Sequence, residues 1–146
     1  MNEEIKNHFI TGAISGDFVA EIIKKCQSDT SIGAYDIFLG QVRKDIIEGK
    51  VVKGIEFTAY EEMANKELIK LQKECLEKFD LIDSHIYHSL GYIPVGKVCF
   101  FVFTSSGHRP AAFAATQYMV NEIKKRVPIF GKEMLEDNTH EWKVNQ

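Results

Sequence analysis

The sequence predicts a single α+β domain in which three helices accompany a mostly antiparallel sheet. The chain has 146 residues, of which 45% are hydrophobic and 11% aromatic, and this suits one compact core. Apolar residues recur at helical spacing in three separate segments, with strand-like segments between them. Glycine and proline residues mark a tight connection between two of these strands, which favours antiparallel neighbours. We therefore expect residues 1–146 to form one domain without repeats or an interdomain linker.

The first third of the chain is predicted to form a strand, a helix and a second strand. A short strand is expected near Phe9 to Thr11, and Ser15 is a typical N-cap for the helix that follows. The apolar residues of this helix share one face: Phe18, Val19, Ile22, Ile23 and Cys26. Ala34 to Arg43 has strand character, and the polar stretch Lys44 to Lys50 predicts a mobile loop that could act as a lid.

The middle of the chain is predicted to contain a strand, a second helix and two further strands. Val52 to Tyr60 alternates like a half-buried strand. The helix is expected from about Glu62, with apolar residues at Leu68, Leu71, Cys75, Leu76 and Phe79. Strand character resumes at Ser84 to Leu90, and the segment Gly91 to Gly96 predicts a tight connection into a strand over Lys97 to Ser105.

The last third is predicted to begin with a helix that has clear boundaries. Pro110 suits the first turn, where its missing N–H is not needed, and Val127 should end the helix because it precedes Pro128. The tail from Ile129 to Gln146 is expected to form either a pair of short strands or an extended arm that carries Trp142.

Composition and charge exclude several classes of protein. A formal net charge of −3 argues against a basic protein that coats nucleic acid, although 18 Lys and Arg residues can still form a local cationic pocket. The first residues, Met1 to His8, lack the apolar run of a signal peptide. The longest apolar run, Val98 to Phe103, is far short of the roughly 20 residues that cross a bilayer. We expect a cytoplasmic protein that binds neither membrane nor nucleic acid.

Cysteine and histidine residues do not predict a metal site. Cys26, Cys75 and Cys99 are an odd number of widely spaced residues, which suggests reduced thiols in the core. His85 and His88 are three residues apart on a strand, so their side chains should face opposite sides of the sheet. We expect no metal and no cofactor.

Three basic features are candidates for binding an anion. Gly107, His108 and Arg109 lead into the third helix, where free backbone N–H groups favour phosphate. The cluster Lys124 to Arg126 lies at the end of the same helix, with Lys132 beyond it, and the apolar strand starting at Phe38 ends at Arg43. Each feature also has a purely structural interpretation, namely a solvated loop, an ordinary basic helix end and a solvent-facing arginine.

In order and content, these segments resemble the large subunit of molybdopterin synthase from about Gly12 to Trp142. The matching motifs are Phe38 to Arg43, Glu56 to Glu62, His88 with Gly91, Pro94 and Gly96, Ser106 to Phe113, and Lys124 with Pro128, Ile129, Phe130, Lys132 and Glu133. The chain departs from the family pattern at Gly131, where a second functional lysine is usual, and at Ser89, where an arginine is common. Lys132 is the nearest substitute for the missing lysine.

The resemblance implies an α/β-hammerhead-like fold and a sulfurtransferase. The enzyme would convert cyclic pyranopterin monophosphate to molybdopterin during molybdenum cofactor biosynthesis. Its sulfur donor would be a small ubiquitin-like carrier subunit with a thiocarboxylate on its C-terminal Gly-Gly, and a homodimer would form the core of a heterotetramer. The catalytic residues would be Lys124 and Lys132, with Lys124 handling protons or stabilising an oxyanion. The substrate-binding residues would be Gln41, Val42, Arg43, His108, Arg109, Lys124, Gly131, Lys132 and Glu133.

The length of the third helix predicts a site that two chains share. His108 and Lys124 are sixteen residues apart, which corresponds to about 24 Å along a helix. One chain can hardly bring both to one substrate, so His108 and Arg109 should face Arg43 and Lys124 of a second copy. Two alternatives remain open. The chain could be a catalytically impaired paralogue that binds the carrier subunit, or a phosphate- or nucleotide-binding module that has no reason to bind a carrier.

Overall fold

The computed structural model describes residues 7–144, which form three helices and eight strands. Expectations for residues 1–6 and 145–146, including the start of the Met1 to His8 segment and the end of the tail, fall outside the described part. The elements in chain order are β1 (Phe9–Thr11), α1 (Gly16–Cys26), β2 (Ala34–Gln41), β3 (Ile46–Ile47), β4 (Lys50–Ala59), α2 (Glu61–Lys78), β5 (Leu81–Pro94), β6 (Val98–Ser106), α3 (Arg109–Arg126), β7 (Ile129–Leu135) and β8 (His140–Trp142).

The strands pair in the order β2-β6-β5-β4-β7-β8, with β1 beside β5 and β3 beside β4. Every pairing is antiparallel except that of β1 with β5, which is parallel. The prediction of three helices and a mostly antiparallel sheet is therefore confirmed. No helix among residues 7–144 has the length and apolar character of a membrane span.

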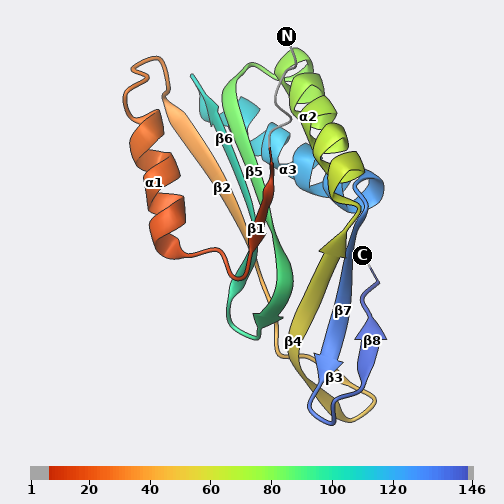
Figure 1. The fold of residues 1–146 in the computed structure, drawn as a ribbon. Coiled ribbons are helices and arrows are strands. Elements are labelled where there is room, and N and C mark those ends of the chain that lie inside the picture. The colour runs from red at the N-terminus through yellow and green to blue at the C-terminus, as the bar shows by residue number, and fades with distance from the viewer. Residues whose placement is uncertain (1–6, 145–146) are drawn as a thin grey trace.

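Helices cover both faces of the β2, β6 and β5 region (Figure 1). Successive residues of β6 alternate between the two faces, because side chains along a strand point to opposite sides. Phe101 and Phe103 pack with Ile22 and the other apolar residues of α1. Phe100 and Val102 belong to the second and larger cluster, which includes apolar side chains from α2 and α3. All of β6 beyond Val98 is buried, which explains its uninterrupted apolar run.

The helix boundaries follow from local chemistry. The Phe18 N–H donates to Ser15 Oγ over 3.1 Å, so Ser15 caps α1 as predicted. In α3, Pro110 occupies the first turn and Val127 is the C-terminal cap, in the position before Pro128. A cluster of ion pairs joins α3 to α2, because the Arg126 guanidinium contacts carboxylates of Glu67 and Glu74 at 2.7 to 3.0 Å.

Three boundaries differ from the sequence prediction. β2 ends at Gln41, two residues before Arg43. The Lys44 to Lys50 stretch contains a short strand that pairs with β4 through a turn at Glu48 and Gly49, both with positive φ, so the prediction of a loop was wrong. β5 continues through Gly91 to Pro94, because residues 91–94 pair with β4. The tail forms a pair of strands, β7 and β8, which was one of the two alternatives.

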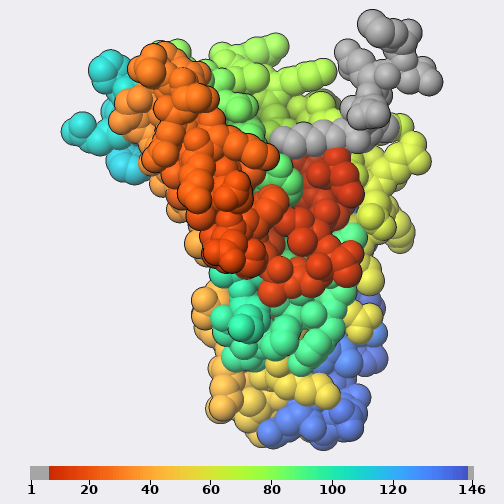
Figure 2. Space-filling model, turned by 60° about the vertical axis from the view of Figure 1, so that its left-hand side comes forward, coloured from red at the N-terminus to blue at the C-terminus, as the bar shows by residue number. Residues whose placement is uncertain are grey.

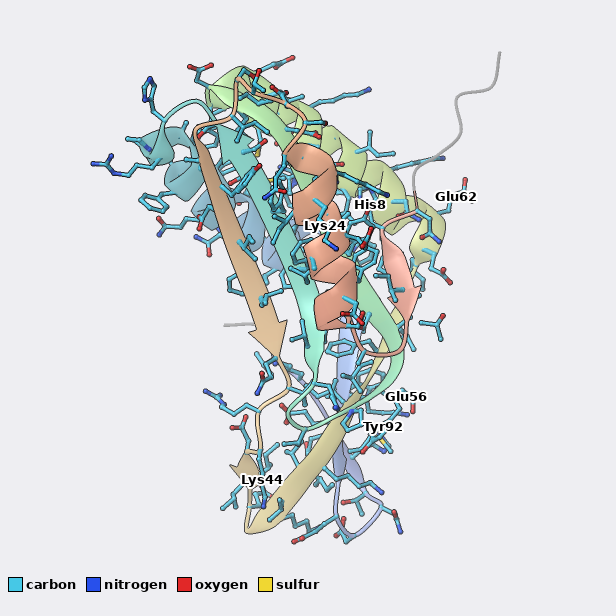
Figure 3. The ribbon with its side chains drawn as sticks, turned by 90° about the vertical axis from the view of Figure 1, so that its left-hand side faces the viewer. His8, Lys24, Lys44, Glu56, Glu62 and Tyr92 are labelled. Carbon is cyan, nitrogen blue, oxygen red and sulfur yellow. The ribbon has the colours of Figure 1, made fainter. Side chains whose placement is uncertain are left out.

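The molecule narrows away from its helices. Figure 2 shows β1 and α1 on the broad part, while β4 and the β7–β8 hairpin contribute to the narrow end. Figure 3 shows Glu56 and Tyr92 together on this lower part of the sheet, where they are cross-strand partners. The Tyr92 ring covers Gly54 so closely that a Cβ at Gly54 would lie 2.5 Å from it, and Tyr92 Oη donates to the Lys53 carbonyl. A side chain at Gly54 would therefore displace the Tyr92 ring from its present position.

Candidate functional site

A pocket of about 180 Å³ lies where the strands meet the last turn of α3. Strand residues form most of its wall, while Ile123 and Lys124 come from α3. The strand residues and the segments beside them contribute Phe38, Gly40, Gln41, Phe57, His88, Cys99, Phe100, Val127, Ile129, Gly131 and Lys143. The pocket thus combines apolar and aromatic walls with two lysines, which is the composition of a site for a partly apolar anion.

Lys124 is the central basic residue of the pocket. Its side chain is accessible from outside, but its Nζ lies 6.0 Å from the centroid of the Phe100 ring, against the pocket wall. Desolvation by the surrounding protein and then the positive charge of Lys143 lower the pKa of Lys124. Such an amine gives up its proton more readily than a lysine in water.

His88 forms a neutral wall of the same pocket. Its Nδ1 donates to the Ser89 carbonyl over 2.8 Å, and its ring packs against Phe57 and Phe100 with centroids 4.8 and 5.2 Å apart. Burial lowers the pKa of His88 to about 4, so the ring is uncharged at neutral pH. His85, in contrast, contacts Cys26 and Phe103 on the α1 side, as the predicted opposite orientation requires.

The third cysteine lies in the pocket wall but does not form a reactive thiolate. Cys99 is buried, and burial raises the pKa of its thiol. Cys26 and Cys75 are buried as well, and all three cysteines are free thiols, as predicted. Among residues 7–144, no cluster of three or more His, Cys, Asp or Glu residues could hold a metal ion.

A second cavity, of about 430 Å³, adjoins the first and contains Arg43. Arg43, Glu133, Lys124 and Lys143 all contribute to its lining, with Asp45, Ile47, Glu141, Trp142 and Val144. Arg43 Nε donates to Asp45 Oδ1 over 2.6 Å, and this contact raises the pKa of Arg43. Burial raises the pKa of Glu133. The structure therefore brings Arg43 and Lys124 to one cavity, as the sequence predicted.

The other predicted residues are divided between the pocket and more distant positions. Gln41 and Gly131 line the first cavity. Val42 is buried in the core, where its N–H donates to the Lys97 carbonyl and its own carbonyl accepts from Gly96. Lys132 projects from the opposite side of β7, because neighbouring residues of a strand alternate, and its Nζ lies 5.8 Å from the centroid of the Trp142 ring.

His108 and Arg109 lie at the far end of α3 from Lys124. His108 is the N-terminal cap, Arg109 is the first helical residue, and both are exposed. The helix between them and Lys124 is continuous, so the expected separation of about 24 Å holds within one chain. Sequence reasoning did not identify Lys143, Cys99 and Phe100 as pocket residues, because nothing local to them indicates which strands they lie beside.

Comparisons with known proteins agree on one family. The model of the family described as MoaE protein matches residues 15–126, more than half of the chain. The molybdopterin synthase catalytic subunit of Pyrococcus abyssi is 39% identical over 121 residues, which cover 83% of this chain and 81% of that protein. The solved structure of molybdopterin synthase from Staphylococcus aureus superposes with a TM-score of 0.81 at 27% identity, covering 95% of this chain and 97% of that one.

One further solved structure shares the fold. It is a complex of subunits 1 and 2 of the molybdopterin-converting factor from Helicobacter pylori, with a TM-score of 0.79 and 20% identity over 94% of this chain and 90% of that one. The family match includes nine of the thirteen residues that line the first cavity and four of the nine that line the second. This chain therefore belongs to the MoaE protein family, the family of molybdopterin synthase catalytic subunits.

Proposed function

We propose that this chain transfers sulfur to cyclic pyranopterin monophosphate and so produces molybdopterin for the molybdenum cofactor. The observation that carries the proposal is the Lys124 amine, which lies in the wall of a partly apolar pocket where its pKa is lowered. An amine with a lowered pKa can exchange protons during a reaction, and its protonated form can stabilise an oxyanion. The name of the Pyrococcus abyssi relative supports the same reaction here.

The two cavities suggest how the substrate is held. Arg43 and Lys124 line the second cavity together, so both could contact the phosphate, and the aromatic walls of the first cavity suit the pterin ring. The polar edges of the pterin could contact Gln41 and Glu133, and Gly131 would leave space for the ring. Because Arg43 already pairs with Asp45, phosphate binding would compete with that carboxylate.

We propose that the sulfur comes from another molecule, because the environment of the pocket thiol Cys99 disfavours its thiolate form. Only the thiolate form of cysteine is reactive, and burial holds Cys99 in its thiol form. We propose that a small ubiquitin-like carrier subunit delivers the sulfur as a thiocarboxylate on its C-terminal glycine. The Helicobacter pylori protein of the same fold forms a complex of two different subunits, which supports a partner of this kind.

The complete site would include residues from a second copy of the chain. His108 and Arg109 cannot reach Lys124 of their own chain, yet both are suited to binding an anion at the start of a helix. The edge strand β2 exposes Ile37 and Leu39 on the α1 side of the sheet, and α3 exposes Phe113 on the other side, so a second copy that meets this edge would cover apolar residues of both faces. A homodimer with one carrier on each chain would be a heterotetramer.

The proposal is tested by reconstitution in solution. The chain is mixed with a thiocarboxylated carrier and the pterin precursor, and the dithiolene product is detected. The unmodified chain should form product, whereas Lys124→Ala should abolish it while the protein still folds and binds the carrier. Lys125→Ala is a matched control, because the neighbouring Lys125 is exposed and pairs with Glu122. Product formation by Lys124→Ala at the normal rate would contradict the assigned role.

A carrier-binding assay run beside the transfer assay separates this function from that of an impaired paralogue. A paralogue would bind the carrier without producing dithiolene, whereas a phosphate-binding module would not bind the carrier at all. Because the reaction uses reduced sulfur and the chain carries three free thiols, we expect the cytoplasm as the compartment.

A further inference from the structure

Lys143 lies directly opposite Gly131 in the β7–β8 ladder. The pairing runs from Met134 with His140 to Lys132 with Trp142, and the Lys143 N–H continues it by donating to the Gly131 carbonyl over 2.8 Å. Side chains of directly opposed residues lie on the same face of a sheet. The side chain of Lys143 therefore extends on the face where Gly131 has none.

The packing around Gly131 explains why a side chain comes from the neighbouring segment instead. A Cβ at Gly131 would lie 3.2 Å from both Ile55 Cγ2 and Phe57 Cε1, which is a tight contact. The backbone of Lys143 lies one strand further out, and Lys143 lines the first pocket together with Gly131. Position 131 therefore supplies no side chain to this part of the pocket, whereas Lys143 supplies one.

Lys143 and Lys124 share three cavities at this end of the molecule. Both line the pocket with His88 and Cys99, the cavity with Arg43 and Glu133, and a third cavity beside Pro128 and Phe130. Lys132 lines none of these three, because it faces the other side of β7. Lys143 also lies beyond residues 15–126, the part of the chain that the family model matches.

The charge of Lys143 acts on four titratable groups of these cavities. Desolvation is the largest cause of the lowered pKa of Lys124, and the charge of Lys143 is the second. The same charge acts to lower the pKa values of His88, Cys99 and Glu133. The charged and titratable groups facing Lys124 from the elements packed around it are His88 of β5, Cys99 of β6, Glu133 of β7, Glu141 of β8, Arg43 and Asp45 after β2, and Lys143 itself.

We propose that Lys143 is the second functional lysine of this pocket and holds the anionic substrate beside Lys124. The inference rests on the proposed sulfur transfer. Two roles follow from its position. Its ammonium group adds positive charge where the phosphate or a developing oxyanion would lie, and it makes the Lys124 amine easier to deprotonate.

The test compares Lys143→Met, which removes the charge and keeps much of the chain length, with Lys143→Arg, which keeps the charge. Lys66→Met is the matched control, because it makes the same change at an exposed lysine of α2 that pairs with Glu62 and lines none of these cavities. We expect Lys143→Met to lower kcat/KM for the pterin substrate by about tenfold or more. Lys143→Arg should recover most of this loss, and Lys66→Met should remain close to the unmodified protein.

A readout without substrate separates this inference from the proposed function. Competitive acetylation across a pH series, read by mass spectrometry, reports the pKa of Lys124 in each variant. Removing Lys143 should raise that pKa, and the limb of the pH–rate profile that Lys124 controls should move to higher pH in Lys143→Met alone. An inactive unmodified chain would contradict the proposed function, while this labelling would still report the coupling between the lysines. An active chain in which Lys143→Met changes neither the Lys124 pKa nor kcat/KM would overturn the inference, as would a pKa shift without any loss of activity.

Discussion

Mixing two inactive variants should restore activity if the site is shared between chains. His108→Ala removes a residue from the start of α3, and Lys124→Ala removes one from its end, about 24 Å away along the helix axis. A homodimer of either variant has two incomplete sites. In a heterodimer, one site combines the intact Lys124 of the first chain with the intact His108 of the second. The other site of that heterodimer lacks both.

The expected recovery follows from counting sites. Random exchange of two variants in equal amounts makes about half of the dimers mixed, and each mixed dimer has one intact site of two, so about one quarter of the unmodified activity should return. The assay is dithiolene formation with saturating carrier, after subunit exchange that is verified by mass spectrometry with one chain isotopically labelled. No activity above that of the separate variants, with mixed dimers present at the expected level, would refute a shared site.

Two further predictions concern the core and its protonation. Phe101→Ala should lower the free energy of unfolding by about 3 to 5 kcal/mol, because the Phe101 side chain is fully buried against α1. Urea titrations measure this change. Leu76→Ala is the control, and it should lower the free energy of unfolding much less because the Leu76 side chain is half exposed. The free energy of unfolding should fall as pH decreases from 6.5 to about 4, because unfolded His88 binds a proton in this window and folded His88 does not. His88→Gln should reduce this slope, and an unchanged slope would contradict the assigned pKa.

Helix positions could be predicted because their signals are local. Ser15 is followed at once by an amphipathic segment, and its hydroxyl caps the helix with a contact only three residues along the chain. Pro110 and Pro128 enclose the third helix by restricting the backbone next to them. Each of these effects acts within one helical turn, so a single sequence contains all the information they need.

Strand boundaries were less predictable because they depend on partners far away in the sequence. The glycine and proline residues of Gly91 to Gly96 suggested a turn, but Gly91, which has a positive φ, remains in β5 because Phe57 of β4 lies opposite it. The strand at Ile46 and Ile47 is a different case, because its partners Lys50 and Val51 are close in sequence; the polar residues around these two isoleucines suggested a loop. A pattern of residue types cannot identify a partner more than thirty residues away, as Phe57 is from Gly91.

The pocket residues also differ in how far they could be predicted from the sequence. Lys124 and Arg43 were predicted because they occupy positions in motifs that resemble the molybdopterin synthase large subunit, whereas their immediate surroundings also allowed an ordinary basic helix end and a solvent-facing arginine. Lys143 carries no comparable signal, since its place in the pocket depends on the register of two short strands and on the missing side chain of Gly131. Shifting that register by one residue would turn Lys143 away from Lys124 and bring Trp142 opposite Gly131. The second lysine of the pocket is thus a property of strand pairing, and only the folded chain reveals it.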